Sequence, residues 1–180
     1  ARSGDALPIA RGLLAQAILA DDSVLEGRAL TACGLLAADT ADIVGAIEYQ
    51  TRALTLAVTY RNRVDQSGAW NNIGLAFGVA GNYELAVRCY HRALADTWDE
   101  PDLRSVRYTV CSNLANSLYQ LGEIAEGLRF GQLSLQEADP TFVAKDPQGA
   151  ILLRRNLVRL LIAAGRVAEA KGLVTEVAAL

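Results

Sequence analysis

Apolar residues recur along the chain with the spacing of amphipathic helices. Between residues 69 and 95, "AWNNIGLAFGVAGNYELAVRCYHRALA", they return every three or four positions in two blocks, which Gly81-Asn82 separates. This spacing predicts two helices joined by a short turn. The same pattern extends over nearly the whole chain of 180 residues, so the sequence predicts an all-α protein of about nine helices.

The two-helix pattern is repeated. Counterparts of the pair Ile73-Gly74 are Cys33-Gly34, Leu114-Ala115 and Leu157, which are spaced by 40 to 43 residues. The predicted elements are an extra helix at 5–20 and hairpins at 24–64, 66–97, 101–138 and 147–180. A hairpin this small cannot bury its own apolar face, so the hairpins must stack into a right-handed solenoid. We expect one domain over 1–180, cut from a longer protein, because the chain contains no methionine.

Small residues are placed where the two helices of a hairpin would cross. Gly34 and Gly74 lie in first helices, and Ala46 and Ala86 in the second helices of the same repeats. A glycine inside a helix costs roughly 1 kcal/mol relative to alanine. We therefore predict that these small residues face each other and allow close approach. In the 101–138 repeat, Ala115 and Gly127 occupy the corresponding places.

Turn and capping residues predict where the helices begin and end. A glycine precedes the second helix of three repeats, at Gly81, Gly122 and Gly165, and suits the left-handed conformation that ends a helix. The first repeat carries Ala41 there. Ser23-x-x-Glu26 is the pattern of a capping box. Proline at the start of a helix predicts long helices from 99–101 to 121 and from 146–147 to 164, with residues 138–145 as the longest loop.

These residues carry a family resemblance. The signature reads Trp70-x-x-Ile73-Gly74-x-x-Phe77, then Ala86-x-x-x-Tyr90-x-x-Ala93. It resembles the tetratricopeptide repeat (TPR), in the longer variant of about 40 residues that occurs in bacterial regulators and kinesin light chains. Only the 66–97 repeat is near the consensus. The resemblance implies a non-catalytic protein- or peptide-binding scaffold.

Composition limits the kinds of partner and the cellular compartment that we expect. The formal net charge is −3, which disfavours nucleic acid as a partner. The sequence has no signal segment and no run of 18 apolar residues, so we expect a cytoplasmic protein that does not enter a membrane. The cysteines Cys33, Cys89 and Cys111 have no disulfide or metal spacing, and we interpret them as reduced core residues.

Three repeats share an asparagine just before the Leu-Gly-like pair, at Asn72, Asn113 and Asn156. Asparagine is a poor helix former, whereas its amide can both donate to and accept from the backbone of an extended peptide. In related TPR domains an asparagine at this place contacts the ligand main chain. A hydrogen bond between repeats is the alternative explanation. The predicted peptide-binding groove consists of Asn71, Asn72, Asn113, Asn116, Tyr119, Gln120, Arg155, Asn156 and Arg159.

Basic residues gather towards the end of this predicted groove. Arg154, Arg155 and Arg159 could hold a carboxylate through charge-assisted hydrogen bonds, or they could form a solvated helix face. His91, the sole histidine, has no acidic residue four positions away and is expected on an exposed helix position beside Cys89. The chain carries no nucleotide-binding, hydrolase or metalloprotease motif. We therefore expect no enzyme activity, no cofactor and no metal.

Two functions follow. The first is a peptide-binding scaffold that serves as the sensory or docking module of a bacterial cytoplasmic regulator. The second is a self-association module, in which the apolar C-terminal end around Val177 and Leu180 forms a homodimer and the groove holds no ligand.

Overall fold

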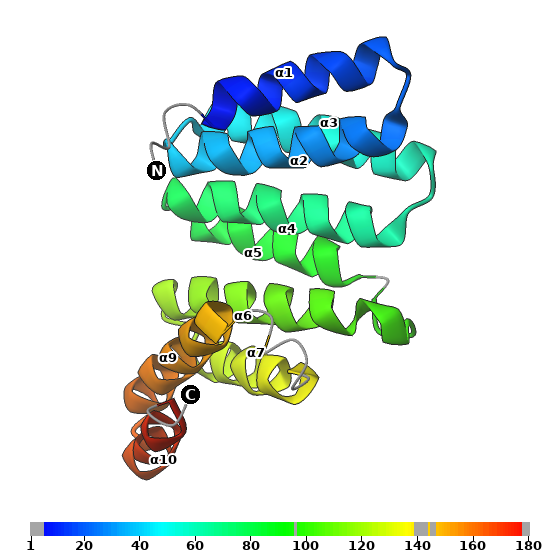
Figure 1. Cartoon of the computed structure of the whole chain (residues 1–180). Coiled ribbons are helices and arrows are strands. Elements are labelled where there is room, and N and C mark those ends of the chain that lie inside the picture. The colour runs from blue at the N-terminus through cyan, green and yellow to red at the C-terminus, as the bar shows by residue number, and fades with distance from the viewer. Residues whose placement is uncertain (1–5, 96, 139–143, 145–146, 178–180) are drawn as a thin grey trace. The chain divides into compact units, whose positions relative to one another are not determined.

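The structure is a computed structural model that describes residues 6–95, 97–138, 144 and 147–177. Its helices are α1 (Ala6–Leu19), α2 (Ser23–Asp39), α3 (Ile43–Thr59), α4 (Arg63–Val79), α5 (Tyr83–Leu94), the 3₁₀ turn η2 (Pro101–Leu103), α6 (Arg104–Gln120), α7 (Ile124–Glu137), α9 (Pro147–Ala163) and α10 (Val167–Val177) (Figure 1). Within these residues there is no strand, so the predicted all-α class is confirmed. The helix pairs α2/α3, α4/α5, α6/α7 and α9/α10 overlap the predicted hairpins 24–64, 66–97, 101–138 and 147–180, but several of their ends differ from the predicted bounds.

The chain divides into two compact units, a first unit of residues 1–93 and a second unit of residues 94–180. In the first unit, α1 packs on α2, α2 on α3, and α3 on α4. In the second unit, α6 packs on α7, α7 on α9, and α9 on α10.

Six short turns between helices share one backbone geometry. The middle residue has a positive φ of 53–81° in each, at Asp21, Ala41, Arg61, Gly81, Gly122 and Gly165. The next residue donates its N–H to the carbonyl five positions earlier, as Asp42 does to Ala37 at 2.9 Å. This hydrogen bond is the mark of a Schellman-type helix end. The predicted left-handed glycines are therefore confirmed, and Ala41 adopts the same conformation although it has a Cβ.

In the first unit each of these turns ends in an aspartate or asparagine that caps the next helix. The capping residues are Asp22, Asp42, Asn62 and Asn82, and each side chain accepts from the backbone N–H three residues later at 2.9–3.2 Å. The predicted capping box was wrong by one residue, because Asp22 caps α2 and Ser23 is its first helical residue. Asp22 precedes Ser23 and offers a carboxylate where the helix has unpaired N–H groups.

Gly34 and Gly74 of the first unit face large side chains. A Cβ on Gly74 would lie 2.7 Å from the ring of Tyr90, and a Cβ on Gly34 would clash with the side chain of Gln50. The nearest atoms to these two glycines thus belong to Gln50 and Tyr90, whereas the prediction placed Ala46 and Ala86 there. A small residue on one helix makes room for a large one on the other, and Tyr90 fills its own hairpin. In the second unit Gly127 has both kinds of neighbour, since a Cβ there would lie 2.8 Å from Leu160 Cδ2 and 3.3 Å from the carbonyl oxygen of Ala115.

The segment before α6 differs from the prediction of one long helix. Residues 101–103 form a 3₁₀ turn, and the α-helix begins at Arg104. Arg107, which is 6% exposed, donates to the carbonyls of Thr97 and Glu100 at 2.5 and 2.9 Å and to Glu137 Oε2 at 3.1 Å. The α5–α6 connection is thus held by one buried guanidinium. Of the predicted loop 138–145, residues 139–143 and 145 lie outside the described residues, as does 146.

Candidate peptide-binding surfaces

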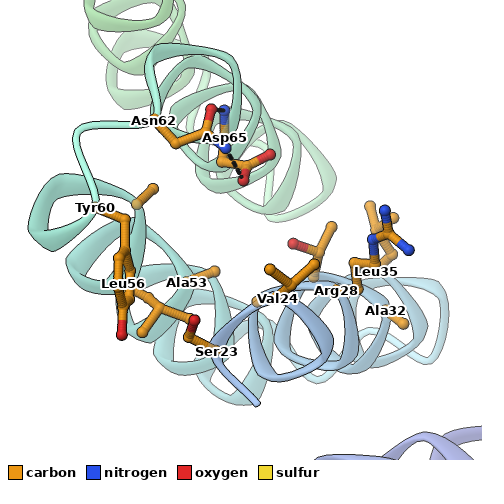
Figure 2. A pocket seen from close by; sticks show the side chains of 13 residues that line it. Ser23, Val24, Arg28, Ala32, Leu35, Ala53, Leu56, Tyr60, Asn62 and Asp65 are labelled. Carbon is orange, nitrogen blue, oxygen red and sulfur yellow. Dashed lines mark hydrogen bonds between the residues drawn. The ribbon is translucent and has the colours of Figure 1, made fainter.

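The first unit contains an open groove of about 630 Å³ between α2, α3 and the start of α4 (Figure 2). It is lined by Ser23, Val24, Gly27, Arg28, Thr31, Ala32, Leu35, Ala53, Leu56, Ala57, Tyr60, Asn62 and Asp65. This volume is within the range of ligand pockets, about 300–1,000 Å³. The groove is large enough for a small ligand or for the side chains of a docked peptide.

Small residues create this hollow. Ala32 on α2 and Ala53 and Ala57 on α3 have no side chain beyond Cβ, so the helices leave space between them. Larger apolar residues stand around the space, with Leu35 on α2 and Tyr60 at the end of α3 (Figure 2). The result is a mostly apolar surface that remains open to solvent.

Polar groups lie at the rim of the groove. Asp65 accepts from Asn62 Nδ2 at 2.6 Å, so its carboxylate is already bound. Arg28 is exposed, and among the described residues it has neither an ion pair nor a side-chain hydrogen bond. The groove therefore offers one uncommitted positive charge next to an apolar surface.

The three repeated asparagines and the groove-lining Ala32 occupy the same position within their helices. Ala32, which lines it, is the tenth residue of the 17-residue helix α2. Asn72, Asn113 and Asn156 are the tenth residues of α4, α6 and α9, each also 17 residues long. By position within their own helices, the asparagines correspond to a groove-lining residue of α2.

In the first unit, the two predicted asparagines belong to a hydrogen-bond network. Asn72 is half-buried and donates to Gln50 Oε1 at 3.4 Å. Gln50, only 1% exposed, donates in turn to the carbonyl of Thr31 at 3.0 Å. Asn71 is buried and donates to Asn72 Oδ1 at 3.3 Å. Asn72 thus makes a repeat-to-repeat contact, the alternative that the sequence left open.

In the second unit, α6 and α9 meet at an aromatic residue and a guanidinium. The Arg159 guanidinium lies 4.3 Å from the centre of the Tyr119 ring, a cation–π distance. On α6, Asn113 and Asn116 are half-buried and Gln120 is exposed. Of the predicted residues, the structure brings Tyr119 and Arg159 into direct contact.

Asn156 differs from Asn72. It is 7% exposed, and its Oδ1 is buried without a hydrogen-bond partner among the described residues. A buried amide oxygen without a partner costs about 1–3 kcal/mol.

The three predicted arginines on α9 do not act as one cluster. Arg154 is half-buried and donates to its own helix at Ala150, and its Nε is buried without a partner among the described residues. Arg159 covers Tyr119, and Arg155 is exposed. Of the three, Arg155 is exposed, and Arg154 and Arg159 are half-buried.

The cysteines, the histidine and the acidic residues were the other candidates for reactive or metal-binding chemistry. All three cysteines are buried, and burial raises the pKa of each thiol, in Cys111 to about 12. His91 is exposed. Among the described residues no group of three or more His, Cys, Asp or Glu is placed to hold a metal ion. Of the described helices, none combines the length and hydropathy needed to span a bilayer.

Sequence reasoning missed the groove of the first unit. Its signal was present at Ala32, the one repeat position where asparagine is replaced by a smaller, apolar residue. The contributions of Ala53, Ala57 and Tyr60 come from the following helix, and no local motif marks them.

Comparisons with known proteins agree with the fold. Two crystal structures of nearly identical TPR-like repeats, from a Podosopora anserina protein described as a kinesin light chain, match with TM-scores of 0.65 and 0.66. The second of them carries a single substitution. Both are 13% identical and cover 98% of this chain, which spans 86% and 85% of theirs. No family model matches, and no curated protein matches. The chain therefore has a TPR-like repeat fold, as the resemblance predicted.

Proposed function

We propose that the protein is a peptide-binding scaffold and that the groove of the first unit receives a segment of its partner. The observation that carries this proposal is the open, mostly apolar groove of about 630 Å³ with an uncommitted Arg28 at its rim. An apolar side chain would enter the hollow at Ala32, Ala53 and Ala57, and a carboxylate would pair with Arg28. Separately, Asn113 and Asn156 of the second unit, which hold the corresponding position of their own helices, would bind peptide backbone at a surface of that unit.

The wider role is inferred from the repeat type. The TPR-like fold is common to protein-interaction scaffolds, and fold alone does not identify a ligand. We place the chain as a docking or sensory module of a bacterial cytoplasmic regulatory protein, without catalytic activity. This assignment rests on the resemblance of its repeats to those of such regulators.

A peptide array with the purified protein tests the groove. Ala32→Phe fills the hollow without removing a hydrogen bond, and we expect it to weaken groove-dependent peptides at least about tenfold. Arg28→Ala should weaken acidic peptides selectively. The matched controls are Ala15→Phe and Arg88→Ala, since both residues are exposed and neither lines the groove. Binding that survives Ala32→Phe would exclude the groove as the peptide site.

The asparagines are tested separately. Asn156→Ala and Asn113→Ala should weaken peptides of every sequence to a similar extent, because a backbone contact does not read side chains. If only particular sequences are affected, these residues contact side chains instead. If none is affected, they have no part in binding.

A further inference from the structure

Exposed apolar residues gather at one edge of the first unit. The α1–α2 and α3–α4 turns lie at the same end of the helices (Figure 1). Beside them stand Leu19, Val24, Val58, Tyr60 and Val64, with exposures between 49% and 88%. These five residues and the turns 20–22 and 60–62 are called the turn edge below. An apolar surface of this kind on a folded protein indicates an interaction site.

The two turns of this edge carry opposite charges. The α1–α2 turn contains Asp21 and Asp22. The α3–α4 turn contains Arg61 and is followed by Arg63, the first residue of α4. Asp65, one turn into α4, is held by Asn62. The edge thus has an acidic end and a basic end with apolar side chains around them.

A surface with this arrangement is complementary to itself. When a second copy is turned by a two-fold rotation, the acidic turn of each copy meets the basic turn of the other, and the apolar residues meet between them. In such an isologous interface every contact occurs twice.

The opposite edge of the first unit lacks this property. Among the described residues, the charged residues in the α2–α3 and α4–α5 turns, the residue before each turn and the first helical turn after it are Asp39, Asp42 and Glu84, all acidic. Two copies of that edge would repel each other. Charge complementarity therefore selects the turn edge and selects a second copy of this chain as its partner.

We propose that the protein forms a two-fold symmetric homodimer through the turn edge. This goes beyond peptide binding and does not depend on it. Because Val24 and Tyr60 also line the groove, the partner copy would stand at the groove mouth, and dimer formation would compete with a bound peptide.

Analytical ultracentrifugation over a concentration series tests the dimer. The wild-type protein should change from monomer to dimer mass as its concentration rises, and high salt should weaken the association. Asp21→Arg or Arg61→Glu alone should raise the dissociation constant about tenfold to thirtyfold, because two attractive contacts become repulsive. Asp39→Arg, on the opposite edge, is the matched control and should leave the constant unchanged.

The charge-reversed proteins also provide a complementation test. Mixed together, the Asp21→Arg and Arg61→Glu proteins should associate with each other more tightly than either does with itself. The double variant should dimerise like the wild type. Circular dichroism verifies that every variant is folded. A wild-type protein that stays monomeric, a dimer indifferent to both reversals, or a mixture that does not associate would overturn the proposal.

Leu19→Ser separates the dimer from the groove, because Leu19 does not line the groove. It should weaken dimerisation and leave peptide binding intact or improved. If peptide binding fails in Leu19→Ser while the dimer persists, the assignment of Leu19 to the dimer surface is wrong.

Discussion

The two units build their helix hairpins alike but connect them differently. In the first unit, helices α2 to α5 begin at residues 23, 43, 63 and 83, and the same three-residue turn occurs within hairpins and between them. Among the described residues of the second unit, that turn occurs only within hairpins, at Gly122 and Gly165. The connection before α6 is longer and is held by Arg107. In the first unit, consecutive repeats are joined by the same three-residue turn. The segment before α6, at the start of the second unit, is held instead by hydrogen bonds from the buried Arg107 side chain.

The largest expected loss of stability follows from replacing Arg107. Arg107→Met removes three hydrogen bonds and leaves the half-buried Glu137 without its closest cation. Breaking a buried charged pair costs about 3–5 kcal/mol, and we expect the free energy of unfolding to fall by about 3 kcal/mol in urea denaturation. Arg104→Met is the control, because the exposed Arg104 lies 3.5 Å from the same carboxylate. It should cost less than about 1 kcal/mol; equal losses would mean that burial of Arg107 is not what matters.

The second-largest expected loss of stability tests the close contact between Gly74 and Tyr90. Gly74→Ala places a methyl group 2.7 Å from the buried ring of Tyr90, an overpacking cost of about 1–3 kcal/mol. The gain in helix propensity offsets part of it, so we expect a net loss of about 1.5 kcal/mol. Gly68→Ala in the same helix has nothing within 4 Å of the new Cβ. It should stabilise by up to about 1 kcal/mol, and thermal unfolding of both variants measures the difference.

Asn72 and Asn156 occupy the same helix position, and their substitution should have opposite signs. Asn72→Leu deprives the buried Gln50 Oε1 of its donor, and we expect a loss of about 1 kcal/mol. Asn156→Leu removes a buried oxygen that has no partner among the described residues and should raise the free energy of unfolding by a similar amount. Peptide binding should be lost in Asn156→Leu, since stability and function oppose each other at a ligand site. A loss of stability in both variants would show that Asn156 has a structural role.

The sequence was sufficient to predict the helices and turns of the hairpins, but not the side-chain contacts between separate helices. Helical periodicity and the glycines at 81, 122 and 165 predicted the helices and turns because both are local properties. A stronger signal was overlooked: Asp22, Asp42, Asn62 and Asn82 recur at intervals of 20 residues and mark the starts of α2 to α5. The partners of Gly34 and Gly74 were mispredicted, and the groove was missed, because they depend on side chains from separate helices. The roles of the nine predicted site residues remain predictions. The homodimer contact that the sequence predicted around Val177 and Leu180 lies outside the described side chains.

The smallest effect tests the turns themselves. Ala41 and Gly122 share a left-handed backbone, with φ of 59° and 81°, but only glycine adopts it without steric cost. Ala41→Gly should therefore stabilise the first unit by about 0.5–1 kcal/mol, and Gly122→Ala should destabilise the second by about as much. No atom lies within 4 Å of a Cβ at Gly122, so the loss would be purely conformational. Chemical denaturation compares the pair. If Ala41→Gly is neutral or destabilising, the Asp42 cap and the turn hydrogen bonds, not the φ preference, determine the stability of these turns.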